Sequence, residues 1–432
     1  MRTGPLVVLL SLAAACGDPD PGPRPASPAA DDPAFTVRGA RAWSLIGNAA
    51  TPGDDTFVLT VTAPAGTGYV DVWVDDAPGQ RLRAASGQFQ LALDVGDLPA
   101  GEHTLVLGAD GAATGFAART FVRSHPYYVV MTTDWDFPDP STPALTRQDQ
   151  LHREHPDLKI THFVGPYTFT DPDMTPARQA ELVAWLTRQV DEHDDEIGLH
   201  IHPYCSFVEY AGLTCNTEAS TVYAYDLSGY TILLSAYDEA EVGAMLVAAD
   251  ELFTANGLPL PRTFRAGGWT ASAATLRALD AHGYVADTSA LNWARLEEWE
   301  GEGTGVLYEW NMANWTPIGD TSQPYYPNVD DALSSAAPTL GLLQVPDNGI
   351  MVDYVDTAEM IEIFEANWDG GALAAPTTLV VGYHPAPGFT STEGWRASGI
   401  CDHAELHLAA RDLGPVVYAT LSEVATAFAP AP

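Results

Sequence analysis

Eight apolar runs that follow His125 constrain the fold of this chain more than any other feature of its sequence. Polar residues do not alternate with apolar ones within them, and amphipathic stretches separate several of them. The runs span 127–133, 158–164, 196–202, 262–268, 283–289, 341–347, 377–383 and 414–420. Strands without alternation are buried on both faces, and strands that alternate with helices form parallel sheets. The sequence therefore predicts an α/β domain built on a parallel sheet.

The stretch 176–194 shows what lies between these runs. Leu182, Leu186 and Val190 fall on one face of a helix, and Thr175 followed by Pro176 is typical of a helix start. Seven or eight parallel strands close most economically into a (β/α) barrel. A doubly wound open sheet is the alternative, but no glycine-rich phosphate-binding motif follows the first strand.

Residues 34–124 have a different pattern, in which apolar and polar residues alternate in short runs between Gly, Pro and Asp turns. This pattern predicts an all-β sandwich. The stretch "LPAGEHTLVLGA" resembles the end of bacterial immunoglobulin-like modules. Such a module either binds carbohydrate or holds another domain away from a surface, and we favour the spacer because a fold alone does not specify a function.

The N-terminus has the features of an export signal. Arg2 precedes an apolar run over 6–15 and then Cys16, and "LAAACGD" resembles the bacterial lipoprotein signal, although Leu12 lies one position further from the cysteine than is usual. The Pro-rich, acidic segment 17–33 is expected to be a disordered tether. We therefore expect an exported protein held at the bacterial outer membrane or cell surface by lipid on Cys16, or a secreted protein if that signal is not used.

Charge and cysteine content exclude some classes of function. The formal net charge is -38, with 57 acidic and 19 basic residues, and such a chain would repel nucleic acid. Without a C-x-x-C pair, a thiolate zinc site is not expected. In an exported protein Cys205 and Cys215 could form a disulfide across a short loop, but Cys401 could replace either partner.

Titratable side chains follow two of the predicted strands. The first run, in "VVMTTDWDFP", leads into Asp134 and Asp136, and the third run contains His200 and His202. Residues two apart in a strand point to the same side, and active-site groups gather at the carboxyl ends of barrel strands. A carboxylate with two imidazoles suits a divalent ion, most naturally Zn²⁺ with a fourth position left for water. Cobalt, nickel or manganese are the alternatives.

Five short motifs resemble those of the polysaccharide deacetylase family, also called NodB-like or carbohydrate esterase family four. They are "TTDWD", "GLHIHP", "FRAGGW", "VADTSA" and "VVGYHP", and they occur in the family's order. The resemblance covers residues 125–432 and implies a distorted (β/α) barrel that removes N-acetyl groups from a polysaccharide with the help of a metal ion.

The resemblance also implies roles for individual residues. The first two motifs imply that Asp134 is the catalytic base, that Asp136 is the metal carboxylate, and that His200 and His202 are the imidazole ligands. The family usually has adjacent aspartates, where this chain inserts Trp135. Asp134 and Asp136 could therefore exchange roles.

The other three motifs imply groups that tune or donate protons. Arg265 would tune the base, His384 would be the catalytic acid, and Asp287 would be the partner of that acid. In the second motif, the two histidines of the family are usually four residues apart. Here Tyr204 lies four residues after His200, and His202 is the second histidine. Taken singly, Arg265 could be a structural ion-pair partner, and Asp287 could be an ordinary turn or cap residue.

Two questions remain open at the level of sequence. The aromatic segment 293–326 could line a sugar groove or form a hydrophobic flap over the barrel. The function could also be hydrolysis of O-acetyl esters or of another C–N bond, or carbohydrate binding without catalysis by a surface lipoprotein.

Overall fold

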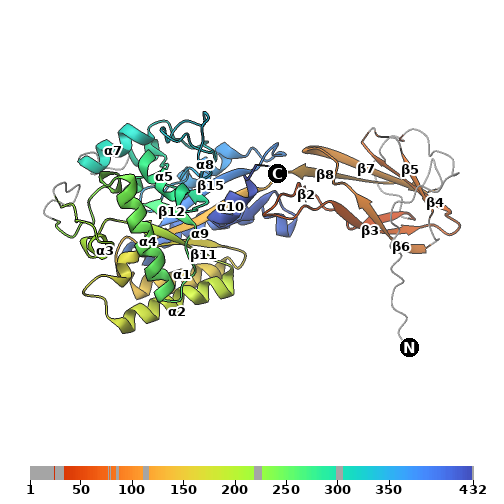
Figure 1. Cartoon of the computed structure of the whole chain (residues 1–432). Coiled ribbons are helices and arrows are strands. Elements are labelled where there is room, and N and C mark those ends of the chain that lie inside the picture. The colour runs from red at the N-terminus through yellow and green to blue at the C-terminus, as the bar shows by residue number, and fades with distance from the viewer. Residues whose placement is uncertain are drawn as a thin grey trace. The chain divides into compact units, whose positions relative to one another are not determined.

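A computed structural model describes residues 24, 34–75, 77, 79–83, 87–109, 116–217, 226–297 and 305–430. Cys16 and almost all of the predicted signal and tether lie outside these residues, as does Trp299. The chain divides into two compact units (Figure 1). Unit 1 comprises 1–126, 370–376 and 406–416, and unit 2 comprises 127–369, 377–405 and 417–432. Among the described helices, none is both long and apolar enough to cross a membrane.

Unit 1 is built from two sheets. One has the order β1-β3-β6 and the other β2-β8-β7-β4-β5. The strands are β1 Thr36–Arg38, β2 Trp43–Leu45, β3 Thr56–Ala63, β4 Tyr69–Val74, β5 Gln80–Arg83, β6 Gly87–Asp94, β7 Gly101–Ala109 and β8 Phe116–Ser124. Both sheets contribute to one core, in which the rings of Phe57 and Phe121 lie 4.9 Å apart. The predicted all-β character is therefore observed, whereas the immunoglobulin-like topology stays a prediction.

Unit 1 also contains two segments from the C-terminal half of the chain. Asp412, which follows the short helix η5 (Ala409–Arg411), accepts hydrogen bonds from the backbone N–H groups of Ala42 and Trp43 at 3.0 and 2.8 Å. The unit is consequently not the uninterrupted stretch 34–124 that the alternation of residues suggests.

Unit 2 contains a strand in each of the eight predicted runs. The strands are β9 Tyr127–Asp134, β10 Ile160–Val164, β11 Glu196–Ile201, β12 Thr263–Ala266, β13 Ala286–Asp287, β14 Leu343–Gln344, β15 Thr377–Tyr383 and β16 Val416–Tyr418. Their order is β14-β13-β12-β11-β10-β9-β15, with β16 paired to β9, and neighbours along this path are parallel. All eight residues of β9 are buried, as the absence of alternation predicted.

The segment after β14 links the two ends of this sheet. Met351 forms a parallel bridge with Gly382 of β15, and the backbone N–H of Val352 donates to the carbonyl of Gly382 at 2.9 Å. Closure therefore depends on an irregular segment and not on a long eighth strand. This arrangement fits the predicted distorted (β/α) barrel better than an open sheet.

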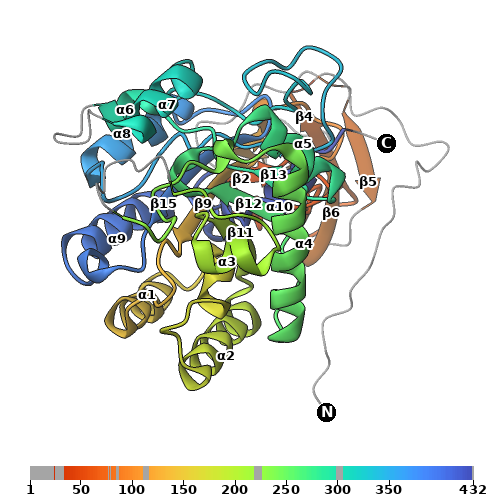
Figure 2. The same cartoon turned by 60° about the vertical axis from the view of Figure 1, so that its left-hand side comes forward.

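Helices surround these strands (Figure 2). They are α1 Thr142–Glu154, α2 Pro176–His193, α3 Cys205–Tyr210, α4 Glu239–Ala255, α5 Ala273–Ala281, α6 Trp293–Glu297, α7 Val306–Trp315, α8 Thr357–Asn367, α9 Thr392–Glu405 and α10 Leu421–Ala427. The start of α2 agrees with the prediction, because the Thr175 side chain accepts from the N–H of Arg178 and Pro176 is the first helical residue.

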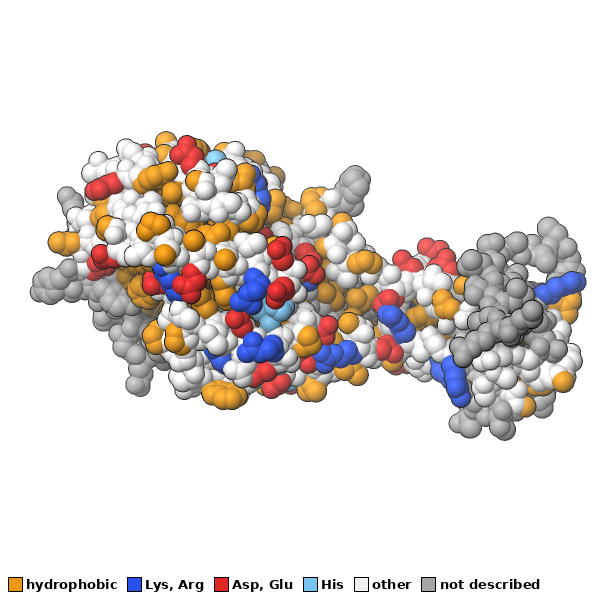
Figure 3. All heavy atoms as spheres, turned by 90° about the horizontal axis from the view of Figure 1, so that it is seen from below, with side chains coloured by type: hydrophobic (Ala, Val, Ile, Leu, Met, Phe, Trp, Pro, Cys, Tyr) orange, Lys and Arg blue, Asp and Glu red, His pale blue; other side chains and the backbone are white. Residues whose placement is uncertain are grey.

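The charged surface of unit 2 is mixed. Arg178 pairs with Asp139 at 2.7 Å and Arg188 with Asp149 at 3.0 Å, around α1 and α2. Figure 3 shows Lys and Arg side chains lying among Asp and Glu side chains on the face seen from below. The acidic excess is thus dispersed on this face, as expected of a solvated surface.

The structure decides two of the open questions about packing. Cys205 and Cys215 form a disulfide, and Cys401 is free and buried. Trp293 and Trp315 of the aromatic segment are 2% and 0% exposed. These two indoles are buried and do not line an open groove, which favours the hydrophobic flap over the sugar groove for this part of the segment.

Candidate functional site

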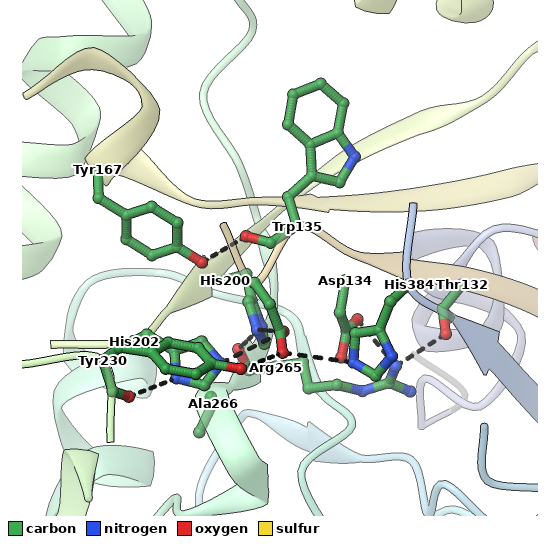
Figure 4. Close-up of polar contacts among 12 residues, drawn as sticks. Thr132, Asp134, Trp135, Tyr167, His200, His202, Tyr230, Arg265, Ala266 and His384 are labelled. Atoms are coloured by element: carbon green, nitrogen blue, oxygen red, sulfur yellow. Dashed lines mark hydrogen bonds and ion pairs between the residues drawn. The ribbon is translucent and has the colours of Figure 1, made fainter. Parts of the chain in front are cut away.

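The carboxyl ends of β9, β11, β12 and β15 bring the predicted site residues together (Figure 4). Asp134 is the last residue of β9, and His384 directly follows β15. His200 of β11 is in register with Arg265 of β12. Because these strands are parallel, their ends meet at one mouth of the barrel.

Trp135 separates the two aspartates and explains their spacing. Its indole is fully buried in the core, 6.2 Å from the ring of Trp185, and it points away from His200 (Figure 4). The Tyr167 hydroxyl donates to the Trp135 carbonyl. Asp134 and Asp136 flank this anchored residue, so both carboxylates reach the mouth.

Asp136 is the carboxylate that adjoins both imidazoles. Its Oδ1 atom lies 3.1 Å from Nε2 of His200 and 3.3 Å from Nε2 of His202. The possible ligand atoms of these three residues all lie within 4.8 Å of one another. Asp134, Asp136 and His384 meet the same criterion, so Asp136 is common to both groups.

The tautomers of the two imidazoles suit a cation. Nδ1 of His200 lies 2.9 Å from the carbonyl of Arg265, and Nδ1 of His202 lies 2.9 Å from the carbonyl of Tyr230. A carbonyl only accepts, so each Nδ1 carries a proton and each neutral imidazole turns an Nε2 lone pair toward Asp136. Three acceptor atoms then face one another, and a divalent ion between them would remove their repulsion. The residues present therefore fit a metal ion.

Asp134 has a different partner. Its Oδ1 accepts from Nη1 of Arg265 at 3.0 Å, and the side chains are 4% and 0% exposed. Arg265 also donates to the Thr132 hydroxyl at 2.8 Å and pairs with Asp347 at 3.2 Å. The guanidinium is thus held by two carboxylates, and it orients Asp134 while balancing its charge.

Asp347 was not singled out by the sequence, although it ends the run 341–347 as Asp134 ends β9. Its Oδ2 accepts from the indole N–H of Trp269 at 2.8 Å, and its buried Oδ1 has no hydrogen-bond partner. Burial raises the pKa of Asp347 to about 6, although the charge of Arg265 opposes that shift.

His384 lies between two carboxylates. Its Nδ1 bonds to Asp353, and its Nε2 lies 3.5 Å from Oδ2 of Asp136. Burial disfavours the charged imidazole, but Asp136 and Asp353 raise the pKa of His384 to about 10. Burial alone would likewise raise the pKa of Asp136, yet the charge of His384 holds it well below its usual range.

The expectation that Asp287 is the partner of His384 is wrong in this structure. Asp287 is fully buried and accepts from the N–H and the hydroxyl of Ser289 at 3.0 and 2.7 Å. Burial raises the pKa of Asp287 to about 6. Asp353 takes the place beside His384 instead, because the segment that closes the barrel brings it there. No motif or strand pattern marks Asp353, since it lies in an irregular segment.

A pocket of about 200 Å³ opens beside these groups. Its lining includes Asp134, Asp136, His384 and the exposed ring of Phe137, which is 48% exposed, together with Pro140, Pro385 and Pro387. Apart from the titratable groups and Ser141, the residues that line the pocket are apolar. This is the usual composition of a small-molecule or substrate site.

No protein-family model matches the sequence, and no curated protein matches it either. Solved structures with some likeness include a family 4 carbohydrate esterase from Streptomyces lividans in complex with acetate, at 13% identity, a TM-score of 0.34, and coverage of 71% of this chain and 97% of that one. Another is a family 4 acetyl xylan esterase from Clostridium thermocellum in complex with a cobalt ion, at 11% identity and a TM-score of 0.34, with 69% and 89% coverage. At these values the likeness does not identify a family.

Proposed function

We propose that this chain is a metal-dependent deacetylase that removes N-acetyl groups from a polysaccharide. The observation that carries the proposal is that three chemically distinct groups meet at one pocket. They are a candidate three-residue metal site, a carboxylate oriented by Arg265, and an imidazole bonded to the carboxylate of Asp353.

Asp136, His200 and His202 would hold the ion. Nitrogen and oxygen ligands in a set of three, with a fourth position open, favour zinc, and cobalt, nickel or manganese are alternatives. Such an ion, when bound, polarises a carbonyl group and lowers the pKa of water.

Asp134 and His384 would move the protons. Asp134 takes a proton from the attacking water as the C–O bond forms, and Arg265 keeps its carboxylate in place. His384 gives its Nε2 proton to the amine nitrogen as the C–N bond breaks. The products are acetate and a free amine, and proton exchange with solvent restores both groups.

The protonated state of His384 favours an amide substrate over an ester. An amine is a poor leaving group unless it is protonated, whereas an alcohol with a good leaving tendency needs less help. Because Asp353 bonds to Nδ1 of His384 and its charge raises the pKa of the imidazole, His384 keeps its proton more readily than a free histidine does. The flat apolar faces of Phe137 and the prolines at the pocket are suited to pyranose rings, which pack on such surfaces.

The experiment that tests this function combines metal analysis with product detection. We expect one equivalent of zinc in the purified protein and release of acetate from an N-acetylated glycan. Asp134→Asn should retain the zinc and lower turnover by roughly a hundredfold or more. Release of acetate from O-acetylated glycans alone would replace the deacetylase by an esterase. A metal-free, inactive protein that binds glycan would replace it by a binding protein.

We also propose that the protein is exported and anchored by lipid on Cys16, with unit 1 as a spacer. The sequence pattern around Cys16 supports this. Labelling with radioactive palmitate should mark the wild-type protein, and Cys16→Ser should prevent labelling. Release of wild-type protein into the medium without detergent would contradict the anchor.

A further inference from the structure

The two oxygens of the Asp136 carboxylate have different partners. Oδ1 lies against Nε2 of both His200 and His202, whereas Oδ2 accepts a hydrogen bond from the Tyr230 hydroxyl at 2.8 Å. His384 is also on the Oδ2 side, at 3.5 Å. The second oxygen of a carboxylate that binds a metal through one oxygen is usually hydrogen-bonded, and Tyr230 supplies such a bond here.

Tyr230 contacts a second member of the candidate metal site by two other routes. Its backbone carbonyl lies 2.9 Å from Nδ1 of His202, and its ring lies 4.4 Å from the His202 ring (Figure 4). The carbonyl selects the tautomer with a free Nε2, and the ring limits rotation of the imidazole. One residue therefore orients two of the three ligands.

The neighbouring tyrosines act differently. Tyr204 donates its hydroxyl to the backbone carbonyl of Asp136 at 3.2 Å, and Tyr167 donates to the carbonyl of Trp135. Both hydroxyls hold the backbone of the loop that carries Asp136. Tyr230 instead donates to the carboxylate itself, so it acts on the candidate ligand group and not on the backbone.

The chain places Tyr230 by a close approach of two backbones. Gly229 has φ +89°, and a Cβ atom there would lie 2.3 Å from the carbonyl oxygen of Pro203. The N–H of Cys205 donates to the carbonyl of Ser228 at 2.7 Å. The segment that carries Tyr230 is thus fastened to the residues that follow His202, and only glycine fits at position 229.

We propose that Tyr230 is a positioning residue that makes Asp136 a one-oxygen metal ligand. The inference rests on the proposed metal site and deepens it. With the phenol bound to Oδ2, the lone pairs of Oδ1 face the two Nε2 atoms. Without the phenol, the carboxylate is free to rotate and to bind an ion through both oxygens.

The test measures binding of Zn²⁺ alone, by competition with a chromophoric chelator at fixed pH. Tyr230→Phe removes the hydroxyl and keeps both the ring and the carbonyl. We expect it to weaken zinc binding roughly 10- to 100-fold, the usual effect of losing a hydrogen bond to a ligand. Tyr204→Phe is the matched control, because it removes a hydroxyl that bonds to the backbone of the same aspartate, and its zinc affinity should stay within about threefold of wild type.

The visible absorption of the Co²⁺ form gives a second measurement. Bands of a four-coordinate cobalt site are stronger than those of higher coordination numbers. Tyr230→Phe should therefore weaken these bands, because Asp136 gains its second oxygen as a ligand, and Tyr204→Phe should leave them unchanged.

The outcomes separate this inference from the proposed function. A folded wild-type protein that binds no Zn²⁺ would remove the metal site and the inference with it. Zinc binding by wild type that Tyr230→Phe leaves unchanged would overturn the inference alone. A Tyr230→Phe protein that fails to fold without metal would also overturn it, because the hydroxyl would then serve folding and not the ligand.

Discussion

Unit 2 contains two clusters of one aspartate and two histidines, and the imidazole protons are placed differently in the two. One comprises Asp136, His200 and His202 at the mouth of the barrel. The other comprises Asp195, His152 and His162, and Asp195 directly precedes β11 while His200 and His202 lie at the other end of that strand. The residue types are the same, but the side chains of the second cluster are fully shielded from solvent, whereas the Asp136 side chain is 15% exposed.

The Asp195 cluster is a hydrogen-bond network centred on one carboxylate. Oδ2 of Asp195 lies 3.0 Å from Nε2 of His152 and 2.8 Å from Nε2 of His162, and Oδ1 accepts from the N–H of Ile160 at 2.8 Å. The amide nitrogen of Gln148 lies 3.4 Å from Nδ1 of His162, so the proton of His162 belongs on Nε2, facing Asp195. In this cluster, N–H donors face the oxygens of Asp195. Burial alone would raise the pKa of Asp195, but these hydrogen bonds lower it.

The Asp136 cluster has the opposite tautomers. Backbone carbonyls hold the Nδ1 protons of His200 and His202, so acceptors meet acceptors around Oδ1 of Asp136. In the described parts of the chain, two sets of three side chains have possible ligand atoms that all lie within 4.8 Å of one another, and both sets contain Asp136. The two clusters have the same residue types. What separates the candidate metal site from the structural cluster is the partner of the imidazole nitrogen that faces away from the aspartate.

The largest effect expected from this comparison concerns zinc affinity. His200→Ala should weaken zinc binding by on the order of 10²- to 10³-fold, because about 10–16 kcal/mol of binding free energy is shared among about four ligands. His152→Ala, the matched change in the other cluster, should retain one zinc per chain. Chelator competition on both purified variants measures this.

The same pair of variants should show the reverse order in stability. At pH 8 and without metal, His152→Ala should lower the free energy of unfolding by roughly 2–3 kcal/mol, since it removes a donor from a buried carboxylate and leaves a cavity. His200→Ala should cost less, because its Nε2 faces an acceptor. Equal losses in urea unfolding, or zinc loss in both variants, would mean that the two clusters do not differ.

A smaller effect separates Asp353 from Asp287. Asp353→Asn should lower turnover on an N-acetylated glycan roughly tenfold or more, because it removes the group that orients and charges His384. Its effect should be weaker on acetyl esters with good leaving groups, which need less protonation. Asp287→Asn should change turnover by less than about threefold on either substrate. If Asp287→Asn lowered turnover and Asp353→Asn did not, Asp287 would be the partner of His384, as the sequence motifs imply.

The smallest effect concerns the pH dependence of stability through Asp287. Its pKa is about 6 in the folded chain against 3.8 for the free group, so the folded state binds this proton more tightly. The resulting stabilisation is present below the lower value and is lost as pH rises through the higher one. Between these two pKa values, the free energy of unfolding of the wild type should fall by about 1–3 kcal/mol relative to that of Asp287→Asn. Parallel stability curves for the two proteins would contradict the raised pKa.

The local sequence pattern was sufficient to predict the strands that carry the residues of the first two motifs. The eight apolar runs each contain a strand, and α2 begins at Pro176 as its cap predicted. The two-residue spacing of His200 and His202 sends both to one side, because alternation of side chains is a property of the strand itself. The same pattern could have identified Asp347, because this residue ends one of these runs.

Residues in irregular segments could not be found in this way. Asp353 lies in the segment that closes the barrel, and Tyr230 follows the close contact of Gly229 with Pro203. Their partners are 31 and 94 positions away in the sequence, at His384 and Asp136. No periodic pattern encodes such pairings, because they depend on the paths of loops.

The sequence by itself determined that a parallel sheet forms, which strands end in titratable side chains, and that an all-β region precedes them. These features depend on periodicity and burial within short stretches, which neighbouring residues impose on one another. Only the tertiary structure decided that Asp136 joins both imidazoles while Asp134 joins Arg265, and that Asp353 replaces Asp287 beside His384. It also decided which imidazole nitrogens carry protons, because that depends on carbonyl groups supplied by Arg265 and Tyr230 from other segments.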